Sequence, residues 1–133
     1  MRKALGMLAV LTCFGNRLCA AEEITVPSGQ PITFVDIIRD APGPDGLTYR
    51  FRFLAPEIAR AAGKVSGDQA ADDMAALCDS YVLPRLANVG PVPSQIIVSL
   101  SDRPVPFGTP DPEVTQFFEA FSIADGACVW DGF

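Results

Sequence analysis

Histidine is absent from all 133 residues of the chain, and this absence excludes a wide range of chemistry. Without an imidazole, neither a Ser-His-Asp triad nor a Cys-His pair can form, and imidazole metal sites are excluded as well. The four cysteines contain no Cys-x-x-Cys motif, which argues against thioredoxin-like redox chemistry. No glycine-rich phosphate loop follows a predicted strand. We therefore expect no nucleotide and no cofactor.

Basic residues are scarce as well. The chain has 10 Lys and Arg against 16 Asp and Glu, a net charge of −6. Nucleic acids and anionic lipids are bound by neutralising their phosphates, so we expect this protein to bind neither. Long apolar runs are also missing. The longest, residues 4–14, is much shorter than the roughly 20 residues that a membrane-spanning helix needs.

The N-terminal segment has the pattern of a secretory signal peptide. Arg2 and Lys3 precede the apolar run, and small residues at 19–21 precede Glu22. We predict a signal peptide over residues 1–21, cleaved after Ala21, and a single domain over residues 22–133. Cleavage removes three of the ten basic residues and leaves seven against 16 acidic ones, a net charge of −9. The predicted location is periplasmic or secreted, with no membrane insertion after cleavage.

Two cysteines, Cys78 and Cys128, remain in the predicted mature chain. Two cysteines in an exported domain usually pair, so we predict a disulfide bond between them. The bond would close a loop of about 50 residues and add roughly 4 kcal/mol of stability on the chain-entropy model.

The hydrophobic pattern predicts strands, one helix and a hairpin. Residues 31–39 and 47–54 are predicted strands, and the second alternates Tyr49, Phe51 and Phe53 with polar residues. Ser66 begins the main helix, with Gln69 as its capping-box partner. Residues 94–101 form the next strand. A Pro-rich stretch over 102–113 then leads into the last hairpin.

Asp125 and Gly126 between two β-rich runs predict a two-residue hairpin turn. This turn pairs Phe121 with Trp130 and Ile123 with Cys128, on the face that must reach Cys78. That face is therefore expected to pack on the helix. The predicted fold class is α+β, with about five antiparallel strands and one main helix packed on one face, in the order β-β-α-β-β-β.

Several motifs resemble a family of small exported alphaproteobacterial proteins of unknown function. They are residues 50–53 (RFRF), 99–105 (SLSDRPV), 107–108 (FG), 115–121 (TQFFEAF) and 128–133 (CVWDGF). The resemblance covers most of the predicted mature chain and implies export, but no activity. Some such sequences carry the label acetolactate synthase. We reject it, because a thiamine-diphosphate enzyme needs several large domains that 133 residues cannot supply.

Carboxylates are the remaining candidates for catalysis or metal binding. Asp68, Asp72 and Asp73 lie in the first turns of the helix and could hold a hard cation. We favour a different role, in which these carboxylates lie on a solvated face and interact with the helix dipole, because the Asp-x-Asp-x-Asp-Gly spacing of a cation site is not present. Asp111 and Glu113 are interpreted as an acidic solvated loop. No metal site is expected.

Glu119 is the one weak catalytic candidate. The hairpin register places it between Phe117 and Phe121, where a carboxylate must be paired or protonated. It could act as the general acid of a small hydrolase. The alternative is a strand-edge residue that reaches Arg103 or solvent, and this alternative is favoured. Similarly, Asp102 and Arg103 could bind an anion or a peptide end, or simply end their strand.

One surface favours binding over chemistry. The sheet face without the helix should display Phe118 and Phe133 beside Arg50, Arg52 and Asp131, and an apolar patch edged by arginine is typical of binding surfaces. Either this patch is exposed, or residues 24–26 or the Pro-rich loop cover it. The leading hypothesis is a binding or adaptor module for an unknown protein or envelope component. The alternatives are the Glu119 hydrolase and a structural accessory subunit.

Overall fold

The structure is a computed structural model that describes residues 23–39, 42–43 and 46–132. The predicted signal peptide and Phe133 lie outside the described residues. Cleavage after Ala21 and the placement of Phe133 on the same sheet face as Phe118 therefore stay predictions. No helix within the described ranges is long and apolar enough to cross a membrane.

The class is α+β, as predicted. The elements follow one another as β1 (Thr33–Ile38), β2 (Pro42–Gly43), β3 (Gly46–Leu54), α1 (Gly67–Leu77), β4 (Gln95–Ser101), β5 (Gln116–Ala124) and β6 (Ala127–Trp130). The predicted order had two strands before the helix. The structure adds β2, a two-residue strand that pairs with β3.

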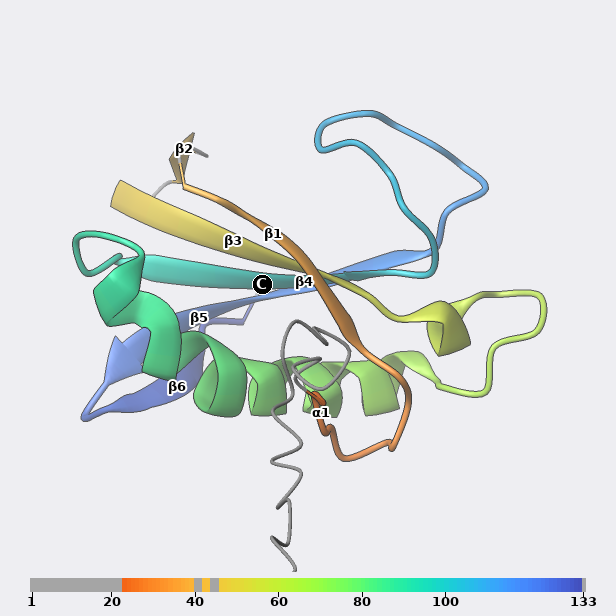
Figure 1. Ribbon diagram of the computed structural model, residues 1–133, viewed down its shortest axis with the longest axis horizontal. Coiled ribbons are helices and arrows are strands. Elements are labelled where there is room, and N and C mark those ends of the chain that lie inside the picture. Colours follow the sequence, from red (N-terminus) through yellow and green to blue (C-terminus); the bar gives the residue numbers. More distant parts are fainter. Residues whose placement is uncertain (1–22, 40–41, 44–45, 133) are drawn as a thin grey trace, which may run out of the picture.

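The sheet is mixed, so the prediction that its strands are all antiparallel is wrong. Its strand order is β1-β3-β4-β5-β6, and β3 runs parallel to β4 while the other neighbours in this order run antiparallel. The cause is the long connection between β3 and β4. It contains α1 and carries the chain back along the sheet, so that β4 starts beside the start of β3. Figure 1 shows α1 below the sheet.

The core lies between the sheet and the helix. Tyr49, Phe51 and Phe53 of β3 are at most 2% exposed, as their alternation predicts. The inward residues of β4 and Phe121 of β5 extend the same layer. Apolar side chains from α1 and the turns that follow it complete the core, namely Met74, Leu77, Cys78, Tyr81 and Val82.

The helix begins as predicted. Ser66 is the N-cap, and its hydroxyl accepts a hydrogen bond from the Gln69 amide at 3.2 Å, while the Gln69 side chain accepts one from the Ser66 amide at 3.0 Å. After Leu77 the chain continues as a π-helical turn, Cys78–Val82, and a 3₁₀ turn, Leu83–Asn88. Pro84 lacks a backbone N–H and does not permit the regular helical hydrogen bonds to continue.

The C-terminal hairpin confirms the predicted register. Phe121 pairs with Trp130 and Ile123 with Cys128, and both turn residues have positive φ (52° at Asp125 and 74° at Gly126). The disulfide between Cys78 and Cys128 is present, with an S–S distance of 2.11 Å. It ties the C-terminal end of the helix to β6.

The burial of Asp73 contradicts the interpretation that this residue lies on a solvated helix face. It is 0% exposed, and its carboxylate accepts hydrogen bonds from the Ser28 amide (2.9 Å), the Ser28 hydroxyl (2.5 Å) and the Gln30 side-chain amide (2.7 Å). Asp68 and Asp72 are exposed, as expected. The N-terminal segment is thus fastened to the helix side of the sheet, and Val26 joins the core.

Candidate functional site

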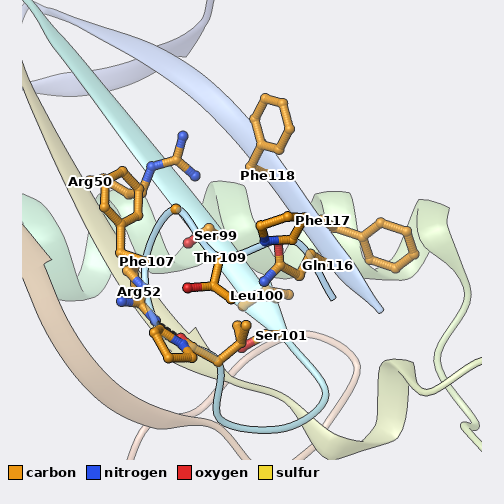
Figure 2. A pocket seen from close by; sticks show the side chains of 14 residues that line it. Arg50, Arg52, Ser99, Leu100, Ser101, Phe107, Thr109, Gln116, Phe117 and Phe118 are labelled. Atoms are coloured by element: carbon orange, nitrogen blue, oxygen red, sulfur yellow. Dashed lines mark hydrogen bonds between the residues drawn. The ribbon is translucent and has the colours of Figure 1, made fainter. Parts of the chain in front are cut away.

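A cavity of about 420 Å³ lies on the sheet face opposite the helix, which we call the outer face. The loop between β4 and β5, residues 102–115, arches over this face (Figure 1) and forms one wall. We call the hollow the Arg50 cavity. Its lining residues are Arg50, Arg52, Ser99, Leu100, Ser101, Val105, Pro106, Phe107, Gly108, Thr109, Pro110, Gln116, Phe117 and Phe118 (Figure 2).

The side chains on the floor of the cavity are determined by the inward and outward alternation of residues along β3, β4 and β5. Because Tyr49, Phe51 and Phe53 face the core, Arg50 and Arg52 must face outward. The registers then place Arg52 beside Ser99 on β4, and Ser99 beside Phe118 on β5. A cation, a hydroxyl and an aromatic ring therefore form a row across neighbouring strands.

The 102–115 loop is held at its base and along its length. Arg60 donates to the Thr115 hydroxyl at 3.2 Å and to the Pro112 and Val114 carbonyls at 3.1 Å, and Asp102 accepts from the Thr115 amide at 2.8 Å. Arg52 donates to the Val105 carbonyl at 2.5 Å. Val105 and Val114 are buried, at 8% and 5% exposed. The loop thus carries Phe107 over the outer face in a defined position.

Arg50 lies between two aromatic rings. Its guanidinium carbon is 5.5 Å from the ring centroid of Phe107 and 5.6 Å from that of Phe118, which are cation–π distances. Within the described residues no carboxylate pairs with Arg50, and its buried Nε atom has no hydrogen-bond partner. Burial, followed by the positive charge of Arg52, lowers the pKa of Arg50 below its ordinary value.

Arg52 has different surroundings. Its guanidinium forms an ion pair with Asp36 at 3.2 Å, in addition to its hydrogen bond to the Val105 carbonyl. Its side chain is 13% exposed and lies 5.9 Å from the Phe107 ring centroid. The two arginines therefore differ: one is balanced by a carboxylate and supports the loop, and the other faces aromatic rings.

The predicted patch is partly exposed and partly covered. Phe118 is 51% exposed and Phe107 49% exposed, so the loop shields the face without closing it. Residues 24–26 do not cover the patch, because they pack on the helix side. Phe107 is the residue that sequence reasoning missed. It appeared only within a motif, since a Pro-rich loop has no period that predicts where its side chains point.

The other candidate residues lie elsewhere. Asp131 accepts hydrogen bonds from the Gln95 side-chain amide at 3.1 Å and the Ser122 hydroxyl at 2.5 Å, and it does not line the Arg50 cavity. Asp102 holds the Thr115 amide and pairs with Arg103 at 3.3 Å. This is the local role that ends a strand. Phe133 is outside the described residues.

Glu119 is half-buried and accepts a hydrogen bond from the Trp130 indole at 2.6 Å. Its partner is therefore neither Arg103 nor solvent alone, but the residue that neighbours it across the hairpin. Trp130 itself is 61% exposed. Neither residue lines the Arg50 cavity, and none of the lining residues is acidic. The described residues also contain no group of three carboxylates or thiols placed to hold a metal ion.

Together these observations define a small, disulfide-linked α+β domain with a cationic, aromatic-walled cavity on the outer face of its sheet. The chain belongs to a family of unknown function, DUF6497, whose model matches residues 11–133. This confirms the resemblance to a family of unknown function. Searches of curated proteins and of solved structures gave no match.

Proposed function

We propose that this protein is a small exported binding module that engages a protein or envelope component through the Arg50 cavity. The observation that carries the proposal is the placement of Arg50 between Phe107 and Phe118 at an open cavity. Arginine and aromatic side chains are the residue types that dominate binding energy at interfaces. Here they converge from two strands and a loop on one point of the surface.

The anchoring of the 102–115 loop supports the same proposal. Arg52 fastens the loop near its β4 end, at Val105, and Arg60 fastens it near its β5 end, so the cavity wall is formed before any ligand arrives. A preformed wall lowers the ordering cost of binding. A loop that served only to connect β4 to β5 would not need side-chain anchors along its length, because those strands are adjacent and antiparallel.

The disulfide supports action in the periplasm or outside the cell. Disulfides persist in oxidising compartments and are rare where thiols are kept reduced. Cys78 and Cys128 are linked across 50 positions of the sequence. Together with the signal-peptide pattern at residues 1–21, this favours export.

Binding is favoured over hydrolysis by the placement of the acidic side chains. A hydrolase built on carboxylates would need Glu119 and a second acid facing one cavity. Glu119 instead accepts a hydrogen bond from Trp130, away from the Arg50 cavity. A structural accessory subunit would need no preformed cavity, so binding remains the better-supported class.

Site-specific photo-crosslinking tests the proposal in the producing organism. A photo-reactive residue replaces Phe107, and in a matched control it replaces Val92, which is 78% exposed and does not line the Arg50 cavity. We expect a discrete adduct from position 107 that position 92 does not give. Adding Phe118→Ser should remove that adduct. The same adducts from both positions would contradict a binding site at the cavity.

A further inference from the structure

The charge of the Arg50 cavity is opposite to that of the whole chain. The sequence has 16 acidic and 10 basic residues, yet the cavity is lined by two arginines and no carboxylate. A concave surface lined by one sign of charge concentrates ligands of the opposite sign. The local potential therefore selects anions, although the protein as a whole repels them.

Arg50 has hydrogen-bonding capacity left for such an anion. Arg52 is already paired with Asp36 and bonded to the Val105 carbonyl. Among the described residues the Arg50 side chain makes no ion pair or hydrogen bond, and it makes cation–π contacts with two rings. Neither ring contact is a hydrogen bond, so the guanidinium N–H groups remain available to a planar acceptor.

Neutral donors surround this charge. Ser99 and Ser101 lie on β4 and Gln116 lies on β5, and all three line the cavity. None of their side chains makes a hydrogen bond to another described residue. Hydroxyl and amide groups at a cavity wall can donate to an acceptor that the arginine positions.

The remaining walls are apolar. Val105, Pro106 and Phe107 contribute carbon surface next to the charged region. A volume of about 420 Å³ lies within the roughly 300–1,000 Å³ typical of small-ligand sites. A ligand that fills the cavity must therefore carry an apolar group beside its anionic one.

A carboxylate fits the cavity better than a phosphate. Among the described residues Arg50 has no carboxylate partner, and an ionised carboxylate carries one negative charge in a plane that matches the guanidinium fork. A phosphate monoester carries about 1.5–2 negative charges at neutral pH, and with Asp36 already paired to Arg52 these would not be balanced.

We infer that the Arg50 cavity binds the carboxylate of a ligand whose adjoining group is apolar, with Arg50 receiving the carboxylate. This inference rests on the proposed binding function and names its ligand chemistry. Two sources share that chemistry: a free organic acid and the C-terminal residue of a peptide or protein. The lowered pKa of Arg50 agrees with this, because an anion would offset the burial and the neighbouring charge that lower it.

Titration with defined probes tests the inference. The purified protein is titrated with phenylacetate, phenylacetamide, the peptide Ala-Ala-Phe, its C-terminal amide and inorganic phosphate, and binding is followed by calorimetry and by NMR shifts of the Arg50 side chain. We expect at least one free carboxylate to bind roughly 10–100-fold more tightly than its amide. Tighter binding of the peptide identifies a C-terminus as the source. Comparable binding of phenylacetate identifies a free acid.

Variants assign the effect to Arg50. Arg50→Gln removes the charge and should weaken carboxylate binding roughly 10–100-fold, whereas Arg50→Lys should give an intermediate loss. Arg39→Gln is the matched control, since Arg39 is exposed and does not line the cavity. If Arg50→Gln fails to fold, the Arg50→Lys variant and the comparison of each acid with its amide still test whether Arg50 binds the carboxylate.

Four results would overturn the inference: equal binding of acid and amide, unchanged carboxylate binding in Arg50→Gln, tighter binding of phosphate, or no binding of either carboxylate at millimolar concentration. The crosslinking experiment above is independent of these probes. A discrete adduct at position 107 with no carboxylate binding would leave the binding module standing and remove only the ligand class.

Discussion

The guanidinium carbon of Arg50, on β3, lies 5.5 Å from the ring centroid of Phe107, at the crown of the loop between β4 and β5. This contact joins the sheet to the loop and shapes the cavity between them. We expect a measurable coupling between the two side chains, because a cation over an aromatic face is worth about 0.5–1 kcal/mol at an exposed site.

A double-mutant cycle measures this coupling. The free energies of unfolding of the wild type, Arg50→Gln, Phe107→Leu and the double variant are compared by urea denaturation, and a coupling of about 0.5–1 kcal/mol is expected. The control cycle pairs Arg50→Gln with Val92→Ala and should show none. A coupling of zero in the first cycle would mean that the loop does not depend on Arg50.

Phe118 and Phe121 lie on the same strand but face opposite sides of it. Phe118 is 51% exposed and Phe121 is 2% exposed. Phe118→Ser should lower the free energy of unfolding by no more than about 1 kcal/mol, because its side chain is half exposed and lies outside the core. Phe121→Ser should lower it by about 3–5 kcal/mol, the cost of emptying a core aromatic site.

Thermal melts of both variants, recorded together, check this difference. A large loss of stability in Phe118→Ser would show that the outer face is part of the core. The proposed binding surface would then lose its physical basis.

The parts of the fold that sequence predicted are those determined by neighbours in the chain. The alternation of Tyr49, Phe51 and Phe53 fixes which side of β3 is buried, and the Asp125-Gly126 turn fixes the last hairpin. The parallel pairing of β3 with β4 could not be predicted in the same way. It depends on the path of the intervening 40-residue segment, and both orientations bury the same residues.

The candidate site shows the same limit. Arg50, Arg52 and Phe118 were identified because strand alternation places them on one face. Phe107 was missed because its position depends on the anchoring of a Pro-rich loop by distant arginines. Asp73 was taken as solvated because its neighbours in the helix are acidic, whereas Ser28 and Gln30, which bury it, are more than 40 positions away.

The disulfide between Cys78 and Cys128 fastens the helical turn to the edge strand β6. Cys78→Ser should lower the free energy of unfolding by about 2–5 kcal/mol. Reduction of the wild type should have a similar effect, and adding reductant to Cys78→Ser/Cys128→Ser should have none. Non-reducing peptide mapping identifies the linked pair. Two free thiols in the exported protein would contradict the prediction.

Export predicts a defined N-terminus. Small residues at 19–21 precede the bond between Ala21 and Glu22, so the mature chain should begin at Glu22. The intact mass of the protein from the periplasmic fraction measures this directly. Ala21→Asp should slow processing, because signal cleavage requires a small residue there, while Glu23→Gln should not. A species that retains Met1 would count against the predicted localisation.

Asp73 fastens the N-terminal segment to the helix through Ser28 and Gln30, and its neighbour Asp72 is exposed. This pair gives a matched test of a buried against a solvated carboxylate. Asp73→Asn removes the charge and points one amide N–H toward groups that already donate. Burying unpaired polar groups in this way should lower the free energy of unfolding by about 1–3 kcal/mol. Asp72→Asn should change it by no more than about 0.5 kcal/mol.

Hydrogen exchange locates the effect. In the wild type the Ser28 amide donates to the Asp73 carboxylate at 2.9 Å, so it should be protected from exchange. The Gly29 amide is the control, because it donates to the Val26 carbonyl at 2.9 Å. Asp73→Asn should speed the exchange of the Ser28 amide more than that of the Gly29 amide. If Asp73→Asn and Asp72→Asn are equally stable and the Ser28 amide stays protected, the packing of Val26 rather than the Asp73 carboxylate holds the N-terminal segment. The N-terminal segment would then owe its position to the core alone.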